Sequence, residues 1–283
     1  MLNKFKNILT DVIANFNEVD GWAMASHVAL SMIMALFPFL IFATAMAGFL
    51  GHDVRASDMV DLAFEAWPDQ VAEPLTREID AVLNGSHAGF LTVGIALALF
   101  FASNGVEAVR VALNRSYRVH EDRSFLFCRL QSLLFVILGA IVLLVVSFLL
   151  VLVPLLSAFA EKAVPYLKEY ETTFWFVRFC LAMFALAFAL FACHAWLPAG
   201  RQPISHLWPG ILATLVIWFA AAGLFAKYLE NFADYGATFA GLAGVMTAQI
   251  FLYLMAVIVI LGGELNAAIL KHRQIRTVEA LAE

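Results

Sequence analysis

The stretch LLFVILGAIVLLVVSFLLVLVP, residues 133–154, decides the fold class of this chain. Its 22 residues contain no charged side chain and one polar side chain, Ser147. An α-helix needs about 20 such residues to cross the hydrocarbon core of a bilayer. A helix inside a water-soluble protein is rarely so long and so uniformly apolar. The stretch therefore predicts a transmembrane helix that is surrounded by lipid.

The composition of the whole chain agrees with a membrane protein. Of its 283 residues, 63% are hydrophobic and only 14% are charged. A water-soluble globule of this composition would expose large apolar patches to water. The three cysteines are odd in number and lack CxxC or zinc-type spacing, which argues against a disulfide framework. We expect an all-α, polytopic integral membrane protein with a single transmembrane domain, residues 1–283.

Further apolar stretches bring the expected number of transmembrane helices to six. Pro38 in the first of them removes one helical hydrogen bond and predicts a kink. The helix of the second is expected to continue beyond the bilayer as far as Asn114. The six spans are expected at about 28–50, 89–106, 132–159, 174–198, 207–229 and 242–269.

Two segments outside these spans also have helical periodicity. In residues 1–27, apolar and charged side chains alternate at helical spacing, which predicts an amphipathic helix. Such a helix lies at the membrane interface, packs on other parts of the protein, or does both. The loop 51–88 holds eight carboxylates against Arg55 and Arg77, and its apolar residues predict two short helices outside the bilayer.

The distribution of basic residues predicts the orientation of the chain. Lys and Arg resist translocation, whereas acidic residues have little influence. Six spans place both termini on one side, where the connecting segments carry eleven Lys and Arg against four on the other side. We therefore expect cytoplasmic N- and C-termini, a cytoplasmic tail 270–283 and a periplasmic acidic loop 51–88. The expected location is the bacterial inner membrane.

A first candidate site is a polar cluster on the cytoplasmic side. Its residues on the second span are separated by four, three and four positions, so they share one helix face. Glu264 lies near the end of the sixth span, and pairing with Arg110 or Arg115 would neutralise it. The cluster is either a clamp between helices, which is the common use of interfacial ion pairs, or part of a transport path. Its members are Ser103, Glu107, Arg110, Asn114, Arg115, Glu264 and Asn266.

A second candidate site lies toward the outer face of the membrane. Arg178, Lys227, Thr247 and Gln249 each fall within about three turns of the outer end of their helix. If they converge, they form a cationic, hydrogen-bonding pocket suited to a phosphate or carboxylate headgroup. The alternative is that Arg178 and Lys227 extend separately to the interface.

Small residues between 235 and 244 predict close helix packing, within one chain or between the subunits of a homo-oligomer. The candidate packing positions are Pro38, Gly236, Ala240, Gly241 and Gly244.

Nothing in the sequence indicates catalysis or a bound cofactor. His27, His194 and His206 lie near cytoplasmic ends of spans, but no histidine pair has metal-ligand spacing. A phosphate-binding loop and a GxSxG elbow are absent as well. We expect no enzymatic activity, no metal, no cofactor and no nucleic-acid partner.

Five motifs occur along nearly the whole chain in a characteristic order. They are Ala29-Leu30-Ser31 through Phe37-Pro38-Phe39-Leu40, Ser103-Asn104-Gly105-Val106 through Ala112-Leu113-Asn114-Arg115, Trp208-Pro209-Gly210, Thr238-Phe239-Ala240-Gly241-Leu242 and Gly262-Gly263-Glu264-Leu265-Asn266. Together they resemble the YihY/BrkB family of bacterial inner-membrane proteins. The chain departs from the family pattern at Phe239-Ala240, where relatives often have Tyr-Gly, and at His27.

The resemblance implies six transmembrane helices and a function in the bacterial envelope. Family members are linked to envelope integrity, serum resistance and lipid movement, and an older label calls some of them ribonuclease BN, a tRNA-processing enzyme. A metal-dependent nuclease needs clustered ligands to activate water, and this sequence shows none.

Our leading hypothesis is a non-enzymatic inner-membrane protein of envelope integrity that assists the movement or export of a phospholipid or other amphiphile. Its expected partners are membrane lipids and a periplasmic lipid-transfer protein. The alternative is a structural scaffold without transport activity.

Overall fold

The computed structural model describes residues 2–50, 88–149, 171–200, 202–232 and 242–282. Within these ranges the chain is helical and has no β-strand, which confirms the all-α prediction. The short helices expected in the loop 51–88 lie outside the described residues. The helices are α1 (Leu2–Glu18), α2 (Gly21–Leu50), α5 (Ala88–Ser116), α6 (Phe125–Ser147), α8 (Glu171–Trp196), α9 (Trp208–Phe232) and α10 (Leu242–Ala282), with the 3₁₀ helix η3 (Ile204–His206) before α9.

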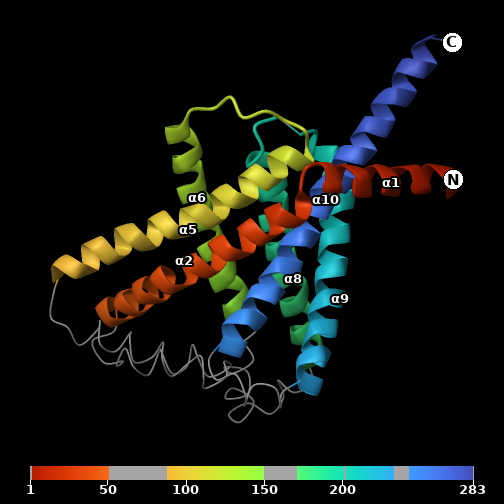
Figure 1. The fold of residues 1–283 in the computed structure, drawn as a ribbon. Coiled ribbons are helices and arrows are strands. Elements are labelled where there is room, and N and C mark those ends of the chain that lie inside the picture. Colours follow the sequence, from red (N-terminus) through yellow and green to blue (C-terminus); the bar gives the residue numbers. More distant parts are fainter. Residues whose placement is uncertain (1, 51–87, 150–170, 201, 233–241, 283) are drawn as a thin grey trace.

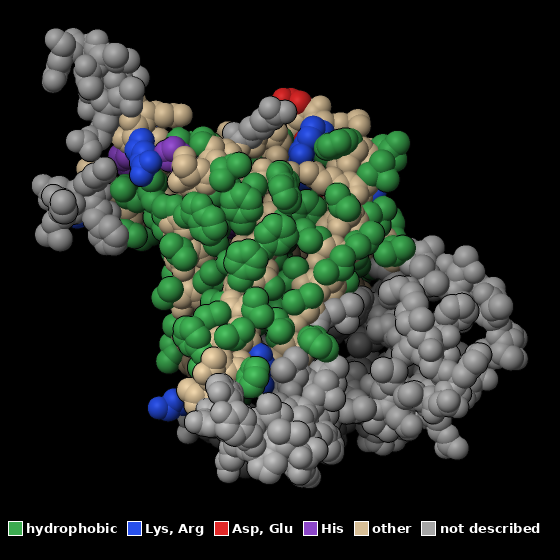
Figure 2. All heavy atoms as spheres, turned by 180° about the vertical axis from the view of Figure 1, so that it is seen from behind, with side chains coloured by type: hydrophobic (Ala, Val, Ile, Leu, Met, Phe, Trp, Pro, Cys, Tyr) green, Lys and Arg blue, Asp and Glu red, His purple; other side chains and the backbone are tan. Residues whose placement is uncertain are grey.

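Several described helices are suited to cross a bilayer. Four are long and apolar enough within the described residues, and Gly21–Ala35 of α2 is a shorter apolar helix. Figure 2 shows apolar side chains as a broad belt, with charged side chains near its two ends. Water would penalise such a belt, whereas lipid does not. The polytopic membrane fold is confirmed, while the number six stays a prediction. The four spans are Phe125–Val142, Thr172–Trp196, Ile204–Leu229 and Val245–Gln274.

The helices form a bundle with two different ends (Figure 1). Helices α2 and α5 lie side by side, and α10 packs against α1, α2, α5 and α9. Helix α1 lies beside α10 at the end of the bundle where α5 stops, α6 starts, α8 stops and α9 starts, and it runs outward from there. We call this end of the bundle the α1 end, and the predicted cytoplasmic polar cluster falls there.

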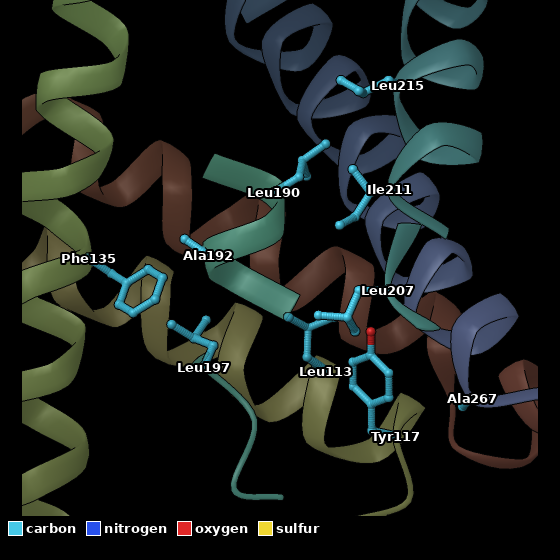
Figure 3. Close-up of a cluster of buried hydrophobic side chains, with 10 residues drawn as sticks. All are labelled: Leu113, Tyr117, Phe135, Leu190, Ala192, Leu197, Leu207, Ile211, Leu215 and Ala267. Carbon is cyan, nitrogen blue, oxygen red and sulfur yellow. The ribbon is translucent and has the colours of Figure 1, made fainter. Parts of the chain in front are cut away.

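Two clusters of buried apolar side chains hold the α1 end together. The first draws on α5, α6, α8, α9 and α10, and Figure 3 shows Leu113, Tyr117 and Leu207 converging in it. The second joins α1, α2, α5 and α10 through Phe16, Val28 and small residues such as Ala108. Lipid tails are as apolar as these side chains, so close van der Waals packing must stabilise the contacts.

A sharp turn after α5 sets the start of α6. The N–H of Val119 donates to the carbonyl of Asn114 at 2.9 Å, and that of Arg118 to the carbonyl of Arg115 at 3.0 Å. This is a Schellman turn, in which Arg118 has the left-handed φ of 58° that usually favours glycine. Ser124 then accepts from the N–H of Phe127 at 3.4 Å as the N-cap of α6.

Helix α6 therefore begins at Phe125 rather than at Ser132, where the third span was expected to start. Arg129, which lies before that expected start, belongs to the helix. The expected tail is also helical over residues 270–282, because α10 continues without a break over 41 residues to Ala282. Helix α2 likewise continues through Pro38.

Helix α1 packs on other parts of the protein, which is one of the two expected uses of its apolar face, and its position at the membrane interface stays a prediction. Val12 and Phe16 are buried against the bundle, whereas Leu9 and Ile13 are exposed. Exposed apolar side chains on a helix at the end of a membrane bundle suit the headgroup region.

Helices α9 and α10 come closest at two glycines. A Cβ atom at Gly210 would lie 2.1 Å from the carbonyl oxygen of Gly262, and one at Gly262 would lie 2.1 Å from Oγ1 of Thr214. Glycine is needed at both positions, because real atoms do not approach so closely. Of the packing positions expected from the sequence, Gly236, Ala240 and Gly241 lie outside the described residues, and Gly244 lies in the first turn of α10.

Replacing Gly210 by alanine should lower the free energy of unfolding by about 1 to 3 kcal/mol, because the added methyl group meets the backbone of α10. Gly223→Ala is the matched control on the same helix, since nothing lies within 4 Å of its Cβ position. Thermal unfolding of both variants in detergent measures the difference. Equal midpoints would contradict the close contact of α9 and α10.

Candidate functional site

The candidate site at the α1 end begins with a group of arginines and carboxylates. The Arg110 side chain is nearly buried and forms ion pairs with Glu107, one turn earlier on α5, and with Glu121 in the turn before α6. Ser132 on α6 donates to Glu107 at 3.1 Å. Asn114 donates to Glu121 at 2.9 Å. These bonds tie α5 to α6 and to the turn between them.

Arg123 connects the same carboxylates to helix α8. Its Nε and Nη2 atoms donate to the two carboxylate oxygens of Glu121 at 2.7 and 2.8 Å. Nη2 also donates to the carbonyl of Leu197 at 2.8 Å, and Gln131 donates to the carbonyl of Trp196 at 2.6 Å. The last carbonyls of a helix lack partners within it, so the two side chains cap the C-terminus of α8. We call Glu107, Arg110, Asn114, Glu121 and Arg123 the arginine cluster.

A second, buried group lies beside the arginine cluster. The hydroxyl of Tyr117 and Nδ1 of His194 are 2.8 Å apart, and the amide nitrogen of Asn266 donates to the same hydroxyl at 3.2 Å. The other atom of that amide, Oδ1, accepts from the N–H of Gly210 at 2.7 Å. Gly210 lies in the first turn of α9, where N–H groups have no partner within the helix. Asn266 of α10 therefore caps α9.

His194 is left with one unused polar atom. Its ring is fully buried, and Nε2 has no hydrogen-bond partner among the described residues. Nδ1 must be the acceptor if the hydroxyl of Tyr117 donates to it, and a neutral ring then carries its proton on Nε2.

A third group clamps α1 onto the bundle. The amide nitrogen of Asn15 lies 2.8 and 2.7 Å from the two carboxylate oxygens of Glu264, which is fully buried. Asp11 accepts from Lys271 at 2.6 Å and from Arg118 at 3.3 Å. Burial alone would raise the pKa of Asp11, but these two bonds outweigh it and the pKa is lowered. We call these contacts the α1 clamp.

The expected pairing of Glu264 with Arg110 or Arg115 is wrong. Arg110 is committed to Glu107 and Glu121, and Arg115 donates to the carbonyl of Val19 at 3.3 Å. The polar cluster expected on the cytoplasmic side is thus divided between three groups. Ser103 belongs to none of them, since its buried hydroxyl donates to the carbonyl of Phe100 in its own helix at 2.8 Å.

The candidate outer residues lie on three different helices. Arg178 is half-buried on α8, Lys227 is exposed on α9, and Thr247 and Gln249 are half-buried on α10. Helix α9 packs against both α8 and α10. The convergence of the four side chains into one pocket stays a prediction.

Several residues of the α1 end were not identified from the sequence. Arg123 was counted only as a basic residue of a connecting segment, and Glu121 and Tyr117 were not singled out at all. Asn15 did give one, because it lies on the apolar face of an amphipathic helix, three positions after Val12. A polar residue on such a face needs a buried partner.

The described residues contain no group of three His, Cys, Asp or Glu side chains that is placed to hold a metal ion. The three polar groups are instead built from hydrogen bonds and ion pairs that join helices.

The arginine cluster predicts a dependence of stability on acidity. Hydrogen bonds from Arg123, supported by Asn114 and by the charge of Arg110, lower the pKa of Glu121 from an ordinary 4.5 to about 2. A lowered carboxyl pKa stabilises the folded state above pH 4.5, and this contribution disappears as the pH falls toward 2.

The thermal midpoint of the detergent-solubilised protein should therefore drop between pH 6 and pH 3. Glu121→Gln should reduce that drop, while Asp122→Asn, at an exposed neighbour, should leave it unchanged. An equal drop in the Glu121→Gln variant would contradict the assignment.

Three relatives match most of the chain. It is 26% identical over 269 residues to a protein of Bacillus subtilis (strain 168), named as the ribonuclease-like protein YfkH, which covers 95% of this chain and 97% of that protein. It is 22% identical over 269 residues to a UPF0761 membrane protein of Pseudoalteromonas atlantica, with coverage of 93% and 86%. A UPF0761 membrane protein of Alteromonas mediterranea is 26% identical over 251 residues, with coverage of 87% and 81%. No solved structure matches.

A family model described as virulence factor BrkB matches residues 12–282. This range includes all of the described helices except the first part of α1, and all residues of the three polar groups except Asp11. The resemblance stated from the sequence motifs is therefore confirmed, and the chain belongs to the virulence factor BrkB family of membrane proteins.

Proposed function

We propose that this protein assists the movement or export of a phospholipid or similar amphiphile from the bacterial inner membrane, without enzymatic activity. Both termini lie in the cytoplasm, and the α1 end faces it. The acidic loop 51–88, with its eight carboxylates, is then periplasmic and offers a docking surface for a periplasmic lipid-transfer partner. We do not extend the ribonuclease-like name of YfkH to this chain, because its sequence has no histidine pair at metal-ligand spacing.

The proposal rests on the position of Arg178 within an apolar span and on its lack of a partner among the described residues. Arg178 lies about 10 Å along α8 from Glu171, within the apolar span Thr172–Trp196. Its side chain is half-buried, and among the described residues it has no hydrogen bond and no carboxylate partner. A charge in a span is costly unless something neutralises it, so an anionic headgroup is a fitting partner. Thr247 and Gln249 supply hydrogen-bonding groups toward the same end of the bundle.

A lipid-transfer assay in proteoliposomes tests this role. Arg178→Ala should slow transfer about tenfold, which is the effect expected from losing one charge-assisted bond to the headgroup. Gln249→Ala should slow it less. Arg178→Lys, which keeps the charge, and Lys6→Ala, which removes a charge from the exposed surface of α1, should stay near the wild-type rate. Absence of transfer by the wild type, with or without periplasmic extract, would contradict the proposal.

A second candidate function is a structural scaffold, and the α1 clamp favours it. The buried polar groups at the α1 end bond mainly to one another or to helix ends, which holds helices in place. Removing one partner from a buried pair typically costs several kcal/mol.

For a scaffold, Glu264→Gln should lower the amount of folded protein, because the new amide nitrogen faces the amide nitrogen of Asn15. Glu18→Gln, at an exposed position of α1, is the control. Size-exclusion yield and the transfer rate per folded molecule are measured together. If folded Glu264→Gln protein still fails in transfer, the carboxylate acts directly and the scaffold hypothesis is wrong.

A further inference from the structure

Arg129 differs from the other arginines of the α1 end. Its Nη1 donates to Oδ1 of Asn104 at 2.7 Å, and its Nη2 donates to the carbonyl of Phe100 at 3.1 Å. The guanidinium also lies over the ring of Phe100, 4.3 Å from its centroid. Two hydrogen bonds and a cation–π contact thus hold the planar group in one orientation at the edge between α5 and α6.

No carboxylate among the described residues forms an ion pair with Arg129. The neighbouring charges are already balanced, since the two carboxylates of the arginine cluster face the guanidiniums of Arg110 and Arg123. Arg118 is likewise paired with Asp11. Arg129 therefore leaves an excess positive charge on this edge of the bundle.

The surroundings of Arg129 are apolar and face outward. Phe125 and Leu126, one helical turn before it on α6, are 78% and 67% exposed, and Leu130 is 59% exposed. Arg129 lies about 6 Å along the helix from Phe125, at the start of an apolar span. This is the depth at which a lipid's phosphate meets its acyl chains.

The guanidinium has hydrogen-bond donors to spare. It carries five N–H groups, and the described residues accept from two of them. The amide nitrogen of Asn104 has no partner there either. We propose that Arg129, oriented by Asn104 and Phe100, binds the phosphate group of a phospholipid in the membrane leaflet at the α1 end.

This site lies at the opposite end of the bundle from Arg178. The proposal of this site requires lipid binding but not lipid transfer, so its test is independent of the test of the proposed function. If both are right, the protein contacts phosphate headgroups in both leaflets.

Native mass spectrometry of the delipidated protein in detergent, titrated with dioleoylphosphatidylglycerol, tests the site. Arg129→Gln should weaken binding about tenfold, because a charge-assisted and potentially bidentate contact is lost. The matched control is Lys6→Gln, which removes one exposed charge from α1 at the same end of the bundle. It should bind like the wild type.

Two further probes separate a lipid site from a site for any anion or any acyl chain. Dioleoylglycerol, which lacks phosphate, should bind at least about tenfold more weakly, and inorganic phosphate at millimolar concentration should not displace the phospholipid. Displacement by phosphate, equal binding of dioleoylglycerol, or wild-type binding by Arg129→Gln would each overturn the proposal. If Arg129→Gln does not purify as a folded protein, Asn104→Ala is measured instead. This variant removes a hydrogen bond that orients the guanidinium and should weaken binding about threefold. Unchanged binding would refute the site.

Discussion

A guanidinium among apolar helices must meet a negative partner, and this requirement organises the α1 end. Arg110 is buried between Glu107 and Glu121, and an unpaired charge there would cost several kcal/mol. Glu121 reaches it because the left-handed residue Arg118 turns the chain back after α5. The same carboxylate then orients Arg123, whose other bond caps α8. One ion-pair system therefore fixes the ends of three helices.

The same requirement divides the arginines into two kinds. Arg110, Arg118 and Arg123 are neutralised inside the protein and serve its architecture. Arg129 and Arg178 have no carboxylate partner in the described part of the chain and lie beside lipid-facing apolar side chains. A scaffold and a lipid-handling protein are therefore not competing descriptions of the same residues. The two proposed roles therefore rest on separate residues.

The sequence predicted the helices far better than it predicted their contacts. Lipid leaves a backbone few alternatives to helix, so long apolar stretches predicted an all-α membrane protein, and four described helices are long and apolar enough to cross a bilayer. The contact between Asn15 and Glu264 joins residues 249 positions apart. It depends on how two helices cross, and the periodicity of the sequence does not show that. Arg129 was assigned to the segment before the third span, because an apolar span predicted from hydropathy ends at the nearest arginine. The contact of Gly210 with Gly262 was missed because a glycine in a helix does not indicate which other helix approaches it.

Helix α10 is continuous over 41 residues, about 60 Å, or roughly twice the thickness of the hydrocarbon core. Its adjacent glycines, Gly262 and Gly263, would be the natural place for it to bend. Gly210, Leu113 and Ser116 pack tightly around them and brace this weak point. This packing opposes bending of α10 at the two glycines. Glu264 and Lys271, which follow the glycines on the same unbroken helix, hold α1 against it.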